Sequence, residues 1–169
     1  MQIVRHALSI LILPATVVIL VPRWLLGSLH GIDTRWPVET LWALLGPILG
    51  VLVFAAGLAL FAWCVVLFAS VGRGTLAPWD PTSELVAVGP YRHVRNPMIS
   101  AVATMLAGET IFLGSRMLAA WLLAFVLINH VYFLLSEERG LARRFGQSYD
   151  AYRSAVPRWL PRRRPWSGG

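Results

Sequence analysis

The chain has 169 residues, of which 57% are hydrophobic and only 14% are charged. A soluble domain of this length has too small an interior to bury that much apolar surface, so the composition excludes a soluble globular protein and predicts a membrane protein. The formal net charge is +7, and all fifteen Lys+Arg residues are arginine, which favours head groups and membrane surfaces as partners over nucleic acid.

Four apolar blocks follow one another along the chain. The first covers about residues 7–26, the length of one membrane-crossing helix, and we expect it to be retained and kinked near Pro14. The second, about 41–70, is longer than one untilted span and forms either one span or two. The third and fourth, about 98–113 and 117–135, are separated only by Gly-Ser-Arg, which predicts a helical hairpin.

The arginines set the expected orientation. With four spans and both termini on one side, that side receives twelve of the fifteen arginines, and the other receives only Arg23, Arg35 and Arg116. The positive-inside rule then places both termini in the cytoplasm. We therefore expect an all-α polytopic membrane helical bundle of about four to five transmembrane helices, forming a single domain over residues 1–169. The absence of lysine suggests a GC-rich bacterial genome and hence a bacterial inner membrane.

The stretch GPYRHVRNPM, residues 89–98, concentrates polar side chains directly before the hairpin. Counting outward from the hairpin turn places Arg95 at the same depth as the glutamate pair Glu137 and Glu138. A guanidinium and a carboxylate at one site could hold the two charged ends of an amino-acid-like cofactor. The same residues could instead form an arginine–glutamate clamp that ties the loop to the last helix. Both interpretations stay open, and we predict no metal site.

The segments LVAVGPYRHVRNP and EERGLARRFGQSYDAYRSAVPRWLP, on either side of the hairpin, resemble the isoprenylcysteine carboxyl methyltransferase and phospholipid methyltransferase families of integral membrane enzymes. The resemblance covers about residues 85–161. It implies an S-adenosylmethionine-dependent methyltransferase without a Rossmann domain, whose cofactor-binding half is residues 71–161 and whose cofactor pocket lies on the cytoplasmic side.

The same resemblance implies which residues bind the cofactor. They lie at both ends of the hairpin: Tyr91, His93, Arg95, Asn96, Pro97, Glu137, Glu138 and Tyr149. Arg95 and Glu138 are also expected to be catalytic. One position departs from the family pattern, because the tyrosine usual two residues after the motif proline is Ile99 here.

His130 is the third expected catalytic residue. It lies seven residues before Glu137, so a regular helix would place both side chains on one face, with His130 about 10 Å deeper. It could position a substrate or remove a proton from it. An intramembrane histidine could equally form a hydrogen bond between helices.

The segment after the glutamate pair carries Leu141, Phe145, Tyr149 and Tyr152 at helical spacing, which predicts an amphipathic helix along the membrane surface. The arginine- and tryptophan-rich run that follows, residues 157–166, is typical of a head-group anchor.

The expected activity is methyl transfer from S-adenosylmethionine to a membrane-embedded hydrophobic acceptor, either a prenylcysteine-like carboxylate or a lipid amine. The expected partners are membrane lipids or a lipid-like substrate, with no nucleic acid. One alternative is an NADPH-dependent membrane reductase of sterol-like lipids, since those enzymes have a similar cofactor-binding end. A second is a non-catalytic membrane scaffold. The glutamate pair favours the methyl donor.

Overall fold

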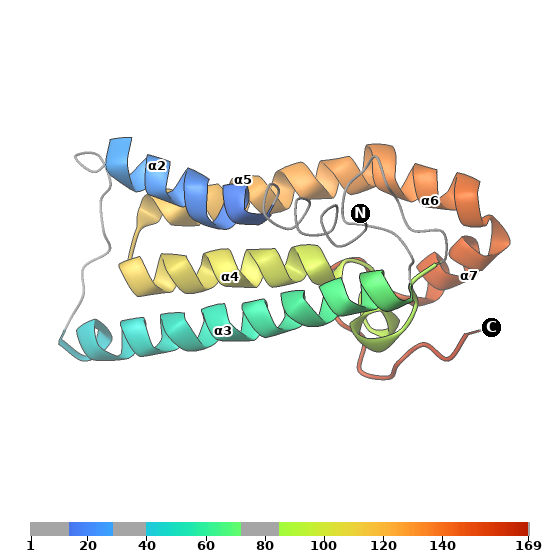
Figure 1. Ribbon diagram of the computed structural model, residues 1–169, viewed down its shortest axis with the longest axis horizontal. Helices are drawn as coiled ribbons and strands as arrows, with labels where there is room; N and C mark the ends of the chain where they lie inside the picture. The colour runs from blue at the N-terminus through green and yellow to red at the C-terminus, as the bar shows by residue number, and fades with distance from the viewer. Residues whose placement is uncertain (1–13, 29–39, 72–84, 169) are drawn as a thin grey trace.

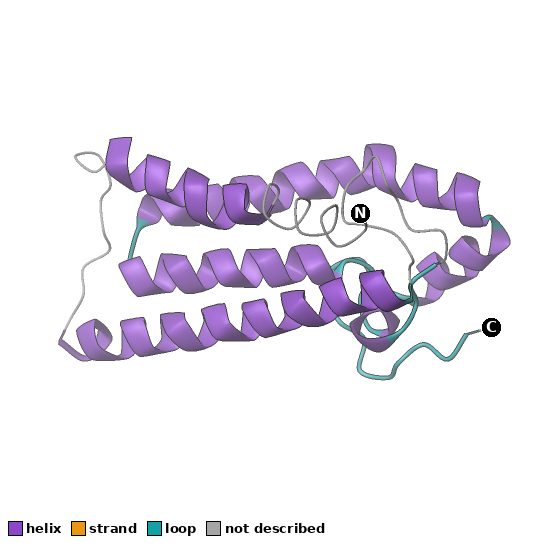
Figure 2. Ribbon diagram, in the orientation of Figure 1, coloured by secondary structure: helices purple, strands orange, loops and turns teal. Residues whose placement is uncertain are grey.

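The computed structural model describes residues 14–28, 40–71 and 85–168, and these ranges are helical with short connections and no strand (Figures 1 and 2). The elements in chain order are η1 (Thr16–Leu20), α2 (Val21–Ser28), α3 (Thr40–Ser70), η2 (Gly89–Arg92), α4 (Pro97–Leu113), α5 (Arg116–Tyr132), η3 (Phe133–Glu137), α6 (Glu138–Phe145) and α7 (Gln147–Ala155). Of these, η1 and η3 are π-helical and η2 is a 3₁₀ turn. The predicted all-α fold is confirmed.

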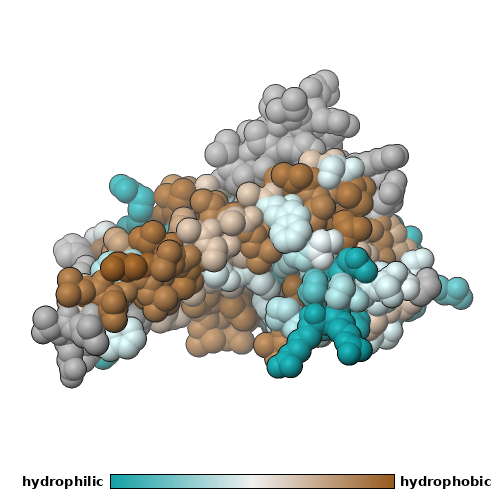
Figure 3. Space-filling model, turned by 90° about the horizontal axis from the view of Figure 1, so that it is seen from below, coloured by the Kyte–Doolittle hydropathy of each residue, from teal (hydrophilic) through white to brown (hydrophobic). Residues whose placement is uncertain are grey.

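Two helical stretches are long and apolar enough to cross a membrane, Trp42–Ser70 and Arg116–Phe145, and two shorter apolar helices accompany them. The second block forms one helix that continues through Pro47. In Figure 3 apolar side chains cover much of the visible face, and polar side chains gather near one end of the molecule. We call this the motif end, because residues 89–98 lie there. The expected number of four to five spans stays a prediction.

The hairpin between α4 and α5 is confirmed, and local chemistry explains its turn. Gly114 ends α4 with φ 64°, a left-handed conformation that glycine adopts without a steric penalty. Ser115 then caps α5, since its hydroxyl accepts a hydrogen bond from the Leu118 N–H at 3.2 Å. Two residues therefore suffice to reverse the chain.

Helices α3 and α4 lie side by side, with their backbones in contact (Figure 1). A Cβ added at Gly57 would lie 2.8 Å from the Ala101 carbonyl oxygen, and one at Gly108 would lie 2.6 Å from the Phe54 nitrogen. Glycine at these positions lets the helices approach as small residues do in membrane bundles. The contact fixes the start of α4, directly after residues 89–96 of the motif.

The first apolar block is described only from Pro14 onward, so residues 7–13 of the expected helix lie outside the described residues. In its π-helical start, the Val17 carbonyl lacks a hydrogen-bond donor within the helix. The Val21 N–H donates to the Thr16 carbonyl, and the next bond in this i→i+5 pattern would join the Val17 carbonyl to Pro22, which has no N–H. The Trp121 indole N–H of α5 donates to the Val17 carbonyl instead, at 3.1 Å. This bond ties the first helix to the hairpin.

Candidate functional site

Residues 89–96, which we call the motif loop, turn sharply before α4 and pack against α3. Gly89 adopts φ 55°, and a Cβ there would come within 2.9 Å of Leu67 in α3, so the turn requires glycine. Tyr91 is buried with Cys64 and Val86 in a small apolar cluster. Pro97 is buried at the first position of α4, where a missing N–H costs nothing. Asn96 directly precedes it, and its carbonyl accepts hydrogen bonds from Ser100.

Arg95 and Glu138 are in direct contact, although 43 residues separate them in sequence. Arg95 Nη1 donates to Glu138 Oε1 at 2.8 Å. Arg158 binds the same carboxylate with two nitrogens, Nε to Oε1 at 2.7 Å and Nη2 to Oε2 at 3.0 Å. The three side chains are 14–19% exposed. Two cations thus share one anion in a largely enclosed place, and the group carries one net positive charge.

We call Arg95, Glu138 and Arg158 the triad. Other polar groups beside it have atoms that could still form hydrogen bonds. Within the part of the chain that the structure describes, Tyr91 Oη and Arg95 Nε are buried and have no nitrogen or oxygen partner, although the Tyr91 hydroxyl lies within hydrogen-bonding reach of the Cys64 thiol. The Glu137 carboxylate lies near them and forms no hydrogen bond or ion pair with a described residue. Buried polar groups are normally paired, so unpaired ones at one place indicate a site for a polar ligand.

Burial is the main cause of the raised pKa values of Tyr91 and Tyr149 at this end of the molecule. Glu137 lies close enough to both phenols for its negative charge to raise their pKa further. The structure therefore brings Tyr91, Arg95, Glu137 and Tyr149 into one neighbourhood.

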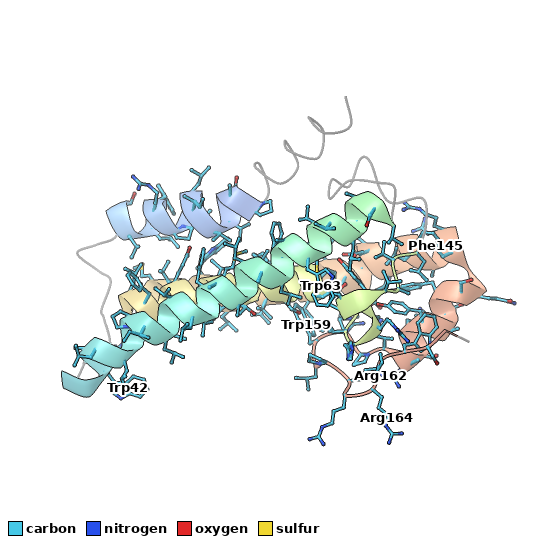
Figure 4. The ribbon with its side chains drawn as sticks, turned by 60° about the horizontal axis from the view of Figure 1, so that its bottom comes forward. Trp42, Trp63, Phe145, Trp159, Arg162 and Arg164 are labelled. Carbon is cyan, nitrogen blue, oxygen red and sulfur yellow. The ribbon has the colours of Figure 1, made fainter. Side chains whose placement is uncertain are left out.

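The segment 156–166, which we call the tail segment, folds back onto the motif loop. The Arg95 N–H donates to the Pro157 carbonyl, the Arg162 N–H to the His93 carbonyl, and the Trp166 N–H to the Arg92 carbonyl, each at 2.9 Å. Arg164 extends outward from this segment in Figure 4. The expectation of a simple head-group anchor is therefore incomplete, since the tail segment also builds the site.

His93, expected to bind the cofactor, is engaged by the tail segment. Its Nδ1 lies 2.8 Å from the Arg162 carbonyl oxygen, and its own carbonyl accepts from the same residue. The ring thus has a structural partner, and its role toward a cofactor stays a prediction. Asn96 and Pro97 likewise occupy structural positions at the start of α4.

The tail segment also reaches His130. The Trp159 indole N–H donates to His130 Nδ1 at 3.0 Å, and the Trp159 ring packs against Phe133 with the ring centroids 5.7 Å apart. Sequence reasoning missed Arg158 and Trp159 as site residues. The only available signal was an arginine beside a tryptophan in a proline-flanked run.

The expected alignment of His130 with Glu137 does not hold, because the helix between them is not regular. The π-helix η3 closes with an i→i+5 bond from the Glu138 N–H to the Phe133 carbonyl, which inserts one residue into the turn. Since each residue rotates a helix by about 100°, the inserted residue moves Glu138 into the place expected for Glu137. Accordingly, His130 and Glu138 contact consecutive residues of the tail segment, Trp159 and Arg158.

The amphipathic segment after the glutamates is also not one helix. Gly146 ends α6 with φ 53°, and α7 starts directly after it. Tyr149 and Tyr152 are consequently buried, in a cluster that Leu141 and Phe145 of α6 also join. Tyr152 donates its hydroxyl hydrogen bond to the Tyr91 carbonyl at 2.7 Å. The aromatic face packs on the motif loop, and the expected position along the membrane surface stays a prediction.

The fold and the site together define a helical membrane protein in which the two ends of a hairpin and a returning tail gather charged groups at one place. The chain matches the phospholipid methyltransferase family over residues 45–148 and belongs to that family, which makes it a membrane methyltransferase. The match runs from α3 into α7 and includes the motif loop, the hairpin and both glutamates. Comparison with curated proteins and with solved structures gave no match.

Proposed function

We propose that this protein transfers the methyl group of S-adenosylmethionine to a membrane-embedded hydrophobic acceptor, a prenylcysteine-like carboxylate or a lipid amine. The observation that carries the proposal is the set of open polar groups beside the triad: the Arg95 guanidinium, the Tyr91 hydroxyl and the Glu137 carboxylate. They offer donors and an acceptor at one end of an otherwise apolar bundle.

These residues fit the amino-acid portion of the cofactor. A guanidinium pairs with a carboxylate, and a carboxylate accepts hydrogen bonds from an ammonium. Both oxygens of Glu138 are already engaged by Arg95 and Arg158, so Glu137 is the acceptor for the ammonium. Glu138 holds the two arginines in place, and Arg95 uses its remaining N–H groups to bind the carboxylate.

When bound, the cofactor supplies a methyl group on a positively charged sulfur, which a nucleophile displaces in line. The chain contributes orientation, through Arg95 and Glu137, and exclusion of water, through the apolar clusters around Tyr91 and Tyr149. A carboxylate nucleophile and the sulfonium neutralise each other during transfer, and a pocket with little water favours that change.

We also propose that the site faces the cytoplasm of a bacterial inner membrane. Exposed arginines support this orientation. Six of them follow the hairpin, at the motif end of the molecule: Arg139, Arg143, Arg144, Arg153, Arg163 and Arg164. Positive residues accumulate on the cytoplasmic side of membrane proteins.

The test is calorimetric titration of the purified protein in detergent with S-adenosylhomocysteine and, separately, with NADPH. We expect binding of S-adenosylhomocysteine only. Arg95→Ala should weaken that binding by about 2 kcal/mol, or roughly 30-fold, because it removes a partly desolvated charged contact. Arg153→Ala is the matched control, since Arg153 is 48% exposed and pairs with Asp150 on the surface.

The other possible results of the titration would favour the alternative functions. Binding of NADPH alone would mean a reductase, and binding of neither compound would mean a scaffold. A folded Arg95→Ala protein with unchanged affinity for S-adenosylhomocysteine would reduce the triad to a clamp between the loop, α6 and the tail segment.

A further inference from the structure

The bond between Trp159 and His130 fixes the protonation of the histidine ring. An indole N–H can only donate, so the nitrogen that it meets, His130 Nδ1, must carry a lone pair. A neutral imidazole with a free lone pair on Nδ1 carries its hydrogen on Nε2. His130 therefore presents an N–H group, not a lone pair, on the side of the ring opposite Trp159.

That N–H group lies on a flank of α5 that is largely apolar. Leu127, Val131 and Leu134, which surround His130 along the helix, are 54%, 51% and 44% exposed. The stretch containing them is apolar enough to cross a membrane. No hydrogen bond joins His130 Nε2 to an acceptor among residues 14–28, 40–71 and 85–168. A donor without an acceptor among hydrocarbon chains raises the free energy, and a bond to an acceptor lowers it again.

The tail segment couples this donor to the cofactor end of the site. Arg158 binds Glu138, and the next residue, Trp159, binds His130. His130 lies eight residues before Glu138, which at 1.5 Å per residue places it about 12 Å deeper along the helix. A substrate chain lying along the bundle would pass His130 with its head group toward Glu138.

We propose that His130 is a substrate-positioning donor: its Nε2–H binds an oxygen acceptor of the membrane-embedded substrate, a carboxylate or an ester carbonyl, and Trp159 holds the ring in this tautomer. The inference rests on the proposed methyl transfer. It assigns His130 no role as a base, because Trp159 occupies the one lone pair that could take a proton. A lipid amine must therefore give up its proton elsewhere.

Two amide substitutions separate the possible roles of the ring. The glutamine amide nitrogen can occupy the position of Nε2 and keep the donor, whereas asparagine can present an acceptor near Nδ1 to Trp159 but has nothing at Nε2. The assay measures methyl transfer to N-acetyl-S-farnesylcysteine in detergent and, separately, to dioleoylphosphatidylethanolamine in vesicles. We expect His130→Gln to exceed His130→Asn in kcat/KM by about tenfold, chiefly through KM, as removal of a positioning contact does.

If His130→Gln exceeds His130→Asn only with N-acetyl-S-farnesylcysteine, the acceptor of the hydrogen bond is a carboxylate. If it does so only with the phospholipid, the acceptor is an ester carbonyl. Loss of about 100-fold in kcat for both variants would overturn the proposal in favour of a base. A more active His130→Asn than His130→Gln would overturn it in favour of a packing role with Trp159.

A second measurement does not depend on turnover. Nitrogen-15 NMR of histidine-labelled protein, with the His130 signals assigned through His130→Gln, should show the Nε2–H tautomer, and Trp159→Phe should shift the ring toward a mixture of tautomers. An Nδ1–H ring in the wild type would refute the inference. Absence of S-adenosylhomocysteine binding would instead refute the proposed function and leave the tautomer result standing.

Discussion

Glu138 is the residue on which the two halves of the site depend. Both of its oxygens accept hydrogen bonds from guanidinium groups, one from the motif loop and one from the tail segment. Hydrogen bonding to Glu138 is the main cause that raises the pKa of Arg158, so this arginine keeps its charge. Its planar fork meets both carboxylate oxygens at once, a geometry that a lysine cannot reproduce.

Arg158→Lys should therefore weaken S-adenosylhomocysteine binding about tenfold, although the charge is kept. The expected reason is that a lysine leaves one Glu138 oxygen unpaired and lets Arg95 reorient. Calorimetry on the variant measures the change, with Arg153→Lys as the control on the exposed surface. Wild-type affinity in Arg158→Lys would show that the second arginine does not support Arg95.

At the scale of helices, the contact between α3 and α4 holds the motif loop in place. The atoms nearest an added Cβ at Gly57 are the Ala101 carbonyl oxygen and the Met105 nitrogen, both of the backbone and both at 2.8 Å. Backbone atoms cannot yield by changing a rotamer. Any side chain at Gly57 must separate the two helices.

We expect Gly57→Val to lower the free energy of unfolding by about 1–3 kcal/mol, the usual cost of overpacking a close contact. It should also weaken cofactor binding, since Arg95 stands two residues before α4. Thermal unfolding in detergent, followed by circular dichroism, measures the first effect. Gly140→Ala in α6 is the control, because no atom lies within 4 Å of its added Cβ. Equal melting of Gly57→Val and the wild type would contradict this packing.

The helices also show where sequence reasoning succeeded. Block lengths and the short Gly-Ser-Arg turn predicted the hairpin, and counting along it brought Arg95 to the glutamate pair. The π-helix η3 was beyond such counting, because its extra residue leaves no pattern in the sequence. The inserted residue brings Glu138, in place of Glu137, into line with His130. Phe133, which starts η3, is fully buried and packs on Trp159, so tertiary contacts accompany the irregularity.

At the scale of the whole molecule, the motif end is assembled from segments far apart in the chain. Tyr149, Tyr152 and Val156 form its apolar centre, and Tyr152 binds the backbone of the motif loop. The break at Gly146 and the return of the tail segment were not predicted. Regular helical spacing of aromatic residues describes one straight helix equally well, and nothing in the spacing indicates the positive φ at Gly146.

The buried phenols predict a loss of stability in alkaline solution. Burial is the main cause that raises the pKa of Tyr91, Tyr149 and Tyr152 in the folded protein above the value of about 10 for an exposed tyrosine. The unfolded chain thus releases these protons at lower pH than the folded one. Their contribution to stability is complete below about pH 10 and is lost as the pH rises through the folded pKa values.

The melting temperature should fall as the pH rises through this range. Tyrosinate absorbance should increase over the same pH interval. Tyr152→Phe should reduce the decline, whereas Tyr132→Phe should not, since Tyr132 is 45% exposed. A melting temperature that stays constant while all four tyrosines ionise would show that the phenols are not enclosed.

The return of the tail segment also sets the order in which the protein matures during synthesis. Residues 157–166 follow the motif loop and the hairpin in the chain, so they can fold back only after those parts have left the ribosome. Until then, the backbone N–H of Arg95 lacks its Pro157 acceptor, and Glu138 lacks one of its two arginines. The hairpin alone therefore does not make the site, and a chain acquires its complete binding site only when residues 157–166 fold back onto it.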